Sequence, residues 1–151
     1  MKKLAQLVLA ATLGVTATYA SADAISDAAM SDIRSEKAKA RDEYRHPQQT
    51  LRFFGLKPDM TVVEVSPGGG WYADILYSVV KEEGKYVAAH FYVDDSSSDY
   101  YKKSVKGFKE KTKPGMKYEG AEVTAFDPMK ALDIAKAGSA DMVLTFRNVH
   151  N

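Results

Sequence analysis

A valine-rich stretch followed two residues later by three consecutive glycines constrains this chain more than any other part of it. Residues 61–65, Thr-Val-Val-Glu-Val, predict a buried strand, because β-branched residues favour a pleated, packed setting. Residues 68–70 are glycine, which tolerates positive φ and lets another group approach the backbone. From Trp71, apolar residues recur at helical spacing until Gly84. A strand, a glycine loop and a helix N-terminus together predict a site for an anionic group, because free N–H donors and the positive helix end face the loop.

Two nucleotide-binding interpretations compete for this loop. The run from Gly68 to Ala73 satisfies the dinucleotide pattern G-x-G-x-x-A, which favours an NAD-dependent oxidoreductase. In the other interpretation, Glu64 is an acid near the strand tip, two residues before the first glycine position, which Ser66 holds here. Glu64 and Pro67 fit the dinucleotide pattern poorly, and a carboxylate inside a buried strand end is costly unless something satisfies it. A tight turn without a ligand is the remaining alternative, but three consecutive glycines are more than a turn needs.

The segment Glu64-Val65-Ser66-Pro67-Gly68-Gly69-Gly70-Trp71 resembles motif I of class I S-adenosylmethionine-dependent methyltransferases. It is similar in particular to exported methyltransferase-like proteins with a PGGGW loop. The resemblance implies S-adenosyl-L-methionine as the cofactor, methyl transfer to an unknown acceptor, and an acid that organises the loop and the methionine end of the cofactor. Methyl transfer depends mostly on positioning and desolvation, so no catalytic residue is predicted. The cofactor-binding residues that we expect are Glu64, Ser66, Gly68, Gly69, Gly70, His90 and Asp127.

Strand patterns alternate with helix patterns along the rest of the chain, which predicts an α/β fold with parallel strands and right-handed crossovers. The expected strands are 61–65, 85–91, 117–126 and 141–146, and the expected helices are 24–44, 47–54, 71–83, 100–113 and 129–137. The resemblance implies a Rossmann-like parallel sheet of the methyltransferase type, with strand order 3-2-1-4. It covers only the cofactor-binding half of that fold.

The end of the second strand departs from the resemblance. A nucleoside-binding fold of this kind places an acid there to accept hydrogen bonds from the ribose hydroxyls. This chain has His90 at that position. His90 would offer one hydrogen bond, or Asp94 or Asp95 would reach back from the following loop. A histidine that simply ends a strand is the alternative.

Other polar residues follow the strands or precede the helix at residues 47–54. The resemblance places Asp127 beside the adenine, although an acid before a proline is also a common turn residue. It places Asn148 and His150 at the mouth of the pocket, in contact with the methyl acceptor, with a polar loop without chemistry as the alternative. Arg45 and His46 either close the cofactor pocket or are solvated loop residues.

The first 22 residues predict a secretory signal peptide. Two lysines precede a short apolar core, and Ala20-Ser21-Ala22 supplies a small-x-small cleavage site. We therefore expect export to the periplasm or the extracellular space and no transmembrane segment in the mature chain. The net charge is +1, and removal of this segment with its two lysines leaves −1. This near-neutral charge gives no reason to expect nucleic acid as a partner.

The absence of cysteine excludes disulfides and thiolate chemistry, and three scattered histidines have no metal-ligand spacing, so no metal is predicted. Residues 23–151 are expected to be the N-terminal, cofactor-binding part of a truncated methyltransferase domain. The fourth strand would then be an open edge that favours self-association. The alternative function is a catalytically inactive binding module with the methyltransferase fold.

Overall fold

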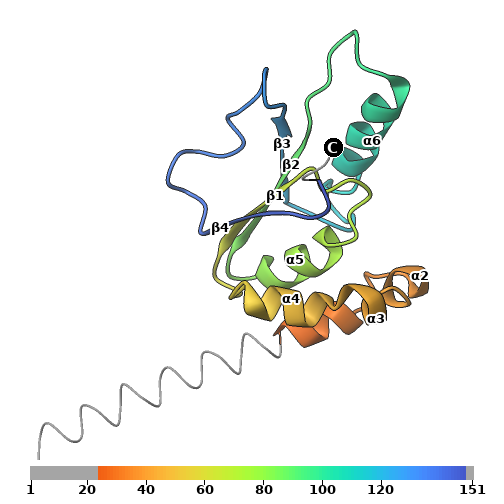
Figure 1. Ribbon diagram of the computed structural model, residues 1–151, viewed down its shortest axis with the longest axis vertical. Helices are drawn as coiled ribbons and strands as arrows, with labels where there is room; N and C mark the ends of the chain where they lie inside the picture. Colours follow the sequence, from red (N-terminus) through yellow and green to blue (C-terminus); the bar gives the residue numbers. More distant parts are fainter. Residues whose placement is uncertain (1–23, 149–151) are drawn as a thin grey trace, which may run out of the picture.

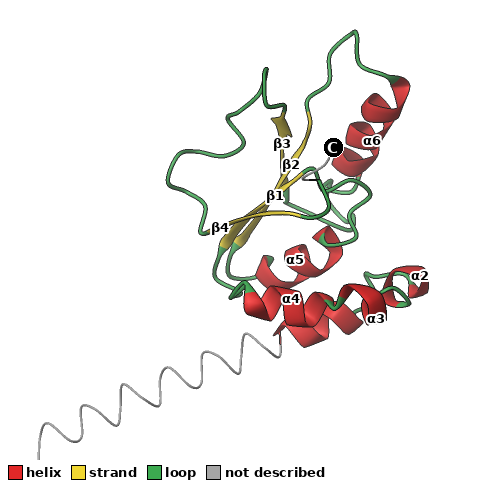
Figure 2. Cartoon of the chain, viewed as in Figure 1, coloured by secondary structure: helices red, strands yellow, loops and turns green. Residues whose placement is uncertain are grey.

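The computed structural model describes residues 24–148, so the predicted signal peptide and His150 lie outside the described residues. Its centre is a sheet of four parallel strands (Figures 1 and 2). The strands are β1 (Thr61–Val65), β2 (Lys85–Phe91), β3 (Glu122–Phe126) and β4 (Met142–Thr145). Their spatial order is β3-β2-β1-β4. The predicted α/β, Rossmann-like class and the strand order 3-2-1-4 are confirmed.

The central strand β1 pairs with β2 on one side and β4 on the other, which explains why its three middle residues are buried. Val62 and Val63 are fully buried on opposite faces of the sheet. Asp141 fixes the start of the β1–β4 pair, because its N–H donates to the Thr61 carbonyl at 3.0 Å and its Oδ2 accepts from the Thr61 N–H at 2.8 Å.

Helices cover one face of the sheet: α4 (Pro47–Phe53), α5 (Ala73–Val80) and α6 (Asp99–Glu110). Figure 1 shows α5 between the sheet and α4, with α6 at the upper right. Their apolar residues form the main core with those of β1 and β2, which buries Leu51, Ile75, Leu76, Val80 and Phe108. This burial is what keeps the loops at both ends of α5 in place.

The opposite face of the sheet is covered by residues 127–140, and this segment is not a helix (Figure 2). The predicted helix at 129–137 is therefore wrong. The carboxylate of Asp127 accepts hydrogen bonds from the N–H groups of Met129 and Lys130, and such local bonds compete with helix formation. Ile134 and Ala135 pack on the sheet, whereas Leu132 stays 67% exposed.

The predicted helix at 24–44 is also wrong as a continuous element. The chain forms three short helices instead: residues 24–30, α2 (Glu36–Lys39) and α3 (Asp42–Arg45). Ser35 starts α2 by accepting a hydrogen bond from the Ala38 N–H at 3.2 Å. His46, with φ of 45°, ends α3 in a left-handed conformation before α4 begins at Pro47.

The third strand begins at Glu122 rather than at residue 117, because the preceding turns bury Tyr118 in the main core. β4 is an edge strand, as expected, and Val143 on it is 56% exposed. Self-association through this edge stays a prediction. In the part of the chain described, no helix has the length and apolar character that crossing a bilayer requires.

Candidate functional site

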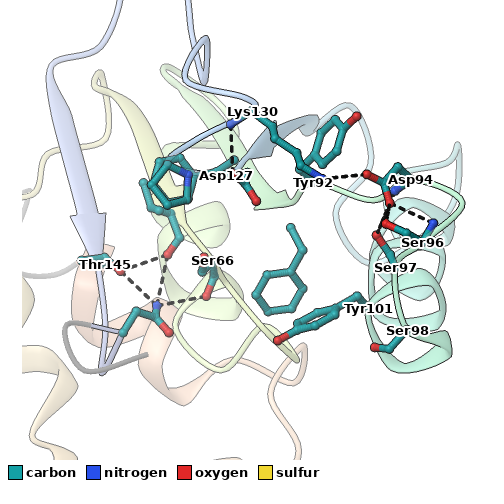
Figure 3. Close-up of a pocket in the computed structure, with 15 residues that line it drawn as sticks. Ser66, Tyr92, Asp94, Ser96, Ser97, Ser98, Tyr101, Asp127, Lys130 and Thr145 are labelled. Atoms are coloured by element: carbon teal, nitrogen blue, oxygen red, sulfur yellow. Dashed lines mark hydrogen bonds and ion pairs between the residues drawn. The ribbon is translucent and has the colours of Figure 1, made fainter.

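A cavity of about 660 Å³ lies beyond the carboxyl ends of the four strands (Figure 3). Ligands bind at this end of open parallel sheets, and the volume is within the usual range for small-molecule sites. Each strand end contributes to its wall, and the loop before α6 completes it. The lining residues are Val65, Ser66, Phe91, Tyr92, Asp94, Ser96, Ser97, Ser98, Tyr101, Phe126, Asp127, Pro128, Lys130, Thr145 and Asn148.

The loop after β1 adopts the unusual backbone that the sequence predicts. Ser66, Gly68 and Gly70 have φ values of 55°, 57° and 95°. Among residues 24–148, the backbone N–H groups of Gly69 and Trp71 donate to no acceptor. Ser66 faces the cavity, whereas Gly69 and Gly70 line a separate hollow of about 600 Å³ beside α2 and α3.

Three side chains from α5 and the segment after α6 hold the loop from behind. The Lys111 amino group donates to the Gly69 carbonyl at 3.1 Å, and the Tyr118 hydroxyl donates to the Gly70 carbonyl at 3.3 Å. The hydroxyl shares its single proton between this carbonyl and the nearer Asp74, whose carboxylate is also paired with Lys117 at 2.6 Å. Burial is the main reason that the pKa of Tyr118 lies above its ordinary value. The hydroxyl therefore stays protonated, and it remains a donor to the loop.

Gly70→Ala is expected to destabilise the protein by about 2 kcal/mol, as strained backbone and close contact combine. A Cβ at Gly70 would lie 2.5 Å from the hydroxyl oxygen of the fully buried Tyr118. Gly68→Ala is the matched control, because its φ is also positive but no atom lies within 4 Å of its added Cβ. Its expected cost is about 1 kcal/mol. Urea unfolding of both variants checks the order, and equal losses would contradict the role of Tyr118.

Glu64 points into the core rather than into water. It is 2% exposed, and the Tyr86 hydroxyl donates to its Oε2 at 2.6 Å. Burial raises the pKa of Glu64 to about 7; the Tyr86 hydrogen bond acts in the lowering direction, and Asp74 adds to the rise. The carboxyl lines neither of the two hollows, so its place is below the loop, among the residues that support it.

His90 does not line the cavity. Its ring is fully buried between Phe91 and Phe108, with ring centroids 4.8 and 5.3 Å away. Nδ1 accepts a hydrogen bond from the Phe91 N–H at 2.8 Å, so the neutral ring carries its proton on Nε2. Burial lowers the pKa of His90 to about 4, and the backbone of Gly68 acts in the raising direction. Nε2 nevertheless has no well-aligned hydrogen bond within the described residues.

Asp94 is the acid that the structure puts on the cavity wall near the end of β2. Its Oδ1 accepts from the N–H and hydroxyl of Ser96 and from the hydroxyl of Ser97, at 3.0, 2.6 and 3.1 Å (Figure 3). Its Oδ2 accepts from the Lys130 amino group at 2.9 Å. The Ser96 hydrogen bond, followed by Lys130, holds the pKa of Asp94 well below its ordinary value. Asp94 is therefore an ionised acceptor.

Asp127 and Asn148 line the cavity, and each also has a structural role; their contacts with a ligand stay predictions. Asp127 is a turn residue, because its Oδ1 accepts from backbone N–H groups at 2.8 and 2.9 Å. The amide of Asn148 donates to the carbonyls of Val65 and Ser66 at 3.3 and 3.2 Å and to the Thr145 hydroxyl at 3.0 Å. These contacts join the tip of β4 to the loop after β1. Of the predicted site residues, Ser66, Asp127 and Asn148 thus meet at one cavity.

No family model matches this chain, and no curated protein matches it. Among solved structures, a protein-L-isoaspartate O-methyltransferase is similar with a TM-score of 0.43 and 18% sequence identity. That match covers 66% of this chain and 28% of the other. Function is therefore inferred from the residues of this chain.

The sequence indicated Asp94 only as an alternative to His90, and no pattern in it indicated Lys130. The acids in the loop that follows β2 were the sequence signal that pointed to Asp94. Lys130 comes from the segment between β3 and β4, 36 residues away along the chain, and no local pattern connects the two. Within the described ranges, no three acidic or histidine side chains gather to form a metal site.

The cavity lining combines polar and aromatic side chains. Asp94, Ser96 and Ser97 form a polar corner that accepts hydrogen bonds. Phe91, Tyr101 and Phe126 supply aromatic surface to the same cavity. The arrangement suits a molecule with hydroxyl groups and a flat apolar part.

Proposed function

We propose that this protein binds S-adenosyl-L-methionine in the cavity of about 660 Å³ and transfers its methyl group to an acceptor. One observation carries the proposal: the cavity joins the ends of all four parallel strands and includes the first residue of the glycine loop, Ser66. In an open α/β sheet this is the place where a nucleoside-containing ligand binds.

The residues present fit this cofactor. Asp94 is an ionised carboxylate on the cavity wall and would accept hydrogen bonds from the ribose hydroxyls. Phe91, Tyr101 and Phe126 offer aromatic surface to the adenine, and the loop beginning at Ser66 would hold the methionine end. The buried Glu64 supports that loop from the core through its hydrogen bond with Tyr86.

The bound cofactor would supply an electrophilic methyl group on a sulfonium. In the proposed transfer the nucleophilic atom of the acceptor would gain the methyl group, and the sulfur would keep the electron pair of the broken carbon–sulfur bond. The protein's part is to align the two reactants and to exclude water. We further propose that the protein is an exported methyltransferase-like protein, with residues 1–22 removed as a signal peptide.

Titration calorimetry with S-adenosylhomocysteine tests the cofactor proposal. We expect a dissociation constant below ~100 μM, which corresponds to a free energy of binding of roughly −5.5 kcal/mol. NAD serves as the competing ligand, and it is expected to give no binding heat. The absence of S-adenosylhomocysteine binding at high micromolar concentration would remove the proposal.

Asp94→Asn is expected to weaken S-adenosylhomocysteine binding about tenfold, because a hydrogen bond to a charged group contributes roughly 1.5 kcal/mol or more. Asp95→Asn is the matched control: it removes the same charge one residue later, at an exposed position that does not line the cavity. Calorimetry of both variants measures the difference. Equal affinities would show that Asp94 does not contact the ligand.

A second candidate is a catalytically inactive binding module with the same fold. It is favoured by the buried His90 where an acid is expected, and by the ion pair that already occupies Asp94. The double variant Glu64→Ala/Gly70→Val separates the two candidates, because it disrupts the loop from both sides. A partner or phenotype that survives this variant would favour the binding module.

A further inference from the structure

A third hollow, of about 330 Å³, lies directly beside the proposed cofactor cavity. It is formed by the end of α3, the start of α5 and the tip of β4. Its lining residues are Tyr44, Arg45, Tyr72, Thr145, Phe146 and Arg147. Thr145 also lines the cofactor cavity, so the two hollows meet at the tip of β4. A molecule in this hollow would lie next to the contents of the cavity.

The hollow has two guanidinium groups and no acidic side chain in its lining. Arg45 and Arg147 form no ion pair with any described residue. The nearby acid Asp42 is already paired with Arg34 at 2.6 Å. Burial, followed by the like charges of Arg41 and Arg147, lowers the pKa of Arg45 from its ordinary value. The two guanidinium groups of this hollow therefore have no acidic partner within residues 24–148.

The remaining wall includes the aromatic side chains of Tyr44, Tyr72 and Phe146. The rings of Tyr72 and Phe146 stack with centroids 3.5 Å apart and planes inclined by 10°. The guanidinium of Arg45 also lies over the Trp71 ring, 4.5 Å from its centroid. This cation–π contact keeps Arg45 at the edge of the hollow. The wall thus combines a fixed positive group with apolar surface.

The backbone at Arg147 is held in an uncommon conformation. Its φ of 64° is left-handed, which costs a side chain other than glycine on the order of 1 kcal/mol or more. Phe146, which precedes it, is fixed by its stack on Tyr72, and Asn148, which follows it, is fixed by its bonds to the loop after β1. Strain of this kind is concentrated at ligand sites.

We propose that this hollow binds an oxyanion, a carboxylate or a phosphate, carried on a flat apolar body. Planar guanidinium groups match the geometry of such oxyanions and bind them with paired hydrogen bonds. If the proposed methyl transfer is correct, on which this last step depends, the molecule held here is the methyl acceptor. Its oxyanion would contact Arg45 and Arg147, and the rest of it would extend past Thr145 toward the cofactor cavity.

Intrinsic fluorescence tests the site without any enzymatic assay, because Trp71 is the chain's single tryptophan. Its emission is titrated with benzoate, acetate, phenyl phosphate and inorganic phosphate, in the absence of cofactor. We expect saturable changes with benzoate, phenyl phosphate or both, and at least tenfold weaker binding of the matching small anion, acetate or phosphate. Tighter binding of benzoate would indicate a carboxylate ligand, and tighter binding of phenyl phosphate would indicate a phosphate ligand. Binding should weaken as the salt concentration rises.

Arg147→Gln is expected to weaken the binding at least tenfold, and Arg45→Gln is expected to do the same. Arg147→Gln is easier to interpret, because Arg45 lies over Trp71 and its loss would alter the tryptophan emission directly. Lys109→Gln removes the same charge from an exposed position on α6, outside the three hollows, and should leave binding unchanged.

The site would be disproved by the absence of saturation with either aromatic anion, or by equal affinity of Arg147→Gln and the parent protein. Equal affinity for benzoate and acetate, and for phenyl phosphate and phosphate, would contradict the proposal that the ligand carries a flat apolar body. These results are independent of the cofactor. Anion binding without S-adenosylhomocysteine binding would support the oxyanion site and remove the methyl-transfer proposal. S-adenosylhomocysteine binding without anion binding would support the cofactor proposal and remove the oxyanion site.

Discussion

Glu64→Gln is expected to stabilise the protein by about 3 kcal/mol at pH 7 and by almost nothing below pH 4.5. Burial raises the pKa of Glu64 from 4.5 to about 7 in the folded protein. A glutamine has the shape of the protonated carboxyl, and its Oε1 can still accept the hydrogen bond from the Tyr86 hydroxyl. The variant therefore keeps the contact and removes the ionisation.

The sign of this pH dependence follows from whether the folded or the unfolded chain releases the Glu64 proton at a given pH. Below pH 4.5 Glu64 is protonated in both the folded and the unfolded chain, so it has its full stabilising effect there. Between pH 4.5 and about 7 only the unfolded chain releases the proton, and stability falls as the pH rises through the folded pKa. His90 acts in the opposite direction, because its pKa is lowered from 6.5 to about 4 and its contribution is lost as the pH falls. The difference between variant and parent isolates Glu64.

Urea unfolding between pH 4.5 and 8 measures this difference. Glu83→Gln is the control, because it removes an exposed carboxylate from the turn after α5. Its unfolding profile should run parallel to that of the parent protein. A constant difference between Glu64→Gln and the parent across the whole pH range would contradict the buried, raised-pKa carboxyl.

Arg34→Leu is expected to destabilise the protein by about 3 kcal/mol, because the buried guanidinium loses its charged hydrogen bonds to the half-buried Asp42 and its bond to the Ala29 carbonyl together. Arg34 is 2% exposed and donates to both carboxylate oxygens of Asp42 at 2.6 Å. It also donates to the Ala29 carbonyl at 2.6 Å and lies 5.1 Å from the centroid of the Trp71 ring. The single guanidinium thus joins the first helix, α3 and the start of the glycine-loop helix.

Thermal or urea unfolding of Arg34→Leu, Asp42→Leu and the double variant measures the pair. The double variant is expected to recover part of the loss, because it removes both charges together. Arg52→Leu, an exposed arginine on α4, is the comparison for the general effect of the substitution. A loss below about 1 kcal/mol in Arg34→Leu would be typical of an exposed pair and would contradict this role.

The predictions around the glycine loop succeeded because they depend on local chemistry. A run of β-branched residues, then glycines, then a helical apolar pattern is specified over a dozen neighbouring residues, and the strand, turn and helix follow. The prediction for residues 129–137 failed although its apolar spacing was helical. There the Asp127 carboxylate accepts hydrogen bonds from two backbone N–H groups, which competes with helix formation. Ile134 packs on a face of the sheet rather than on another helix.

The sequence by itself determined the α/β class, the glycine loop and the burial of Glu64, because each follows from short-range pattern. The strand order was implied by the resemblance of the glycine loop to the methyltransferase motif, and the structure confirms it. Only the tertiary structure decided which polar groups share a cavity. His90 and Asp94 are four residues apart, yet the direction of each side chain at the end of β2 buries the first and leaves the second on the cavity wall. Likewise, Arg45 and Arg147 lie about a hundred positions apart in the sequence and meet only because β4 pairs with β1, which brings the tip of β4 beside α3.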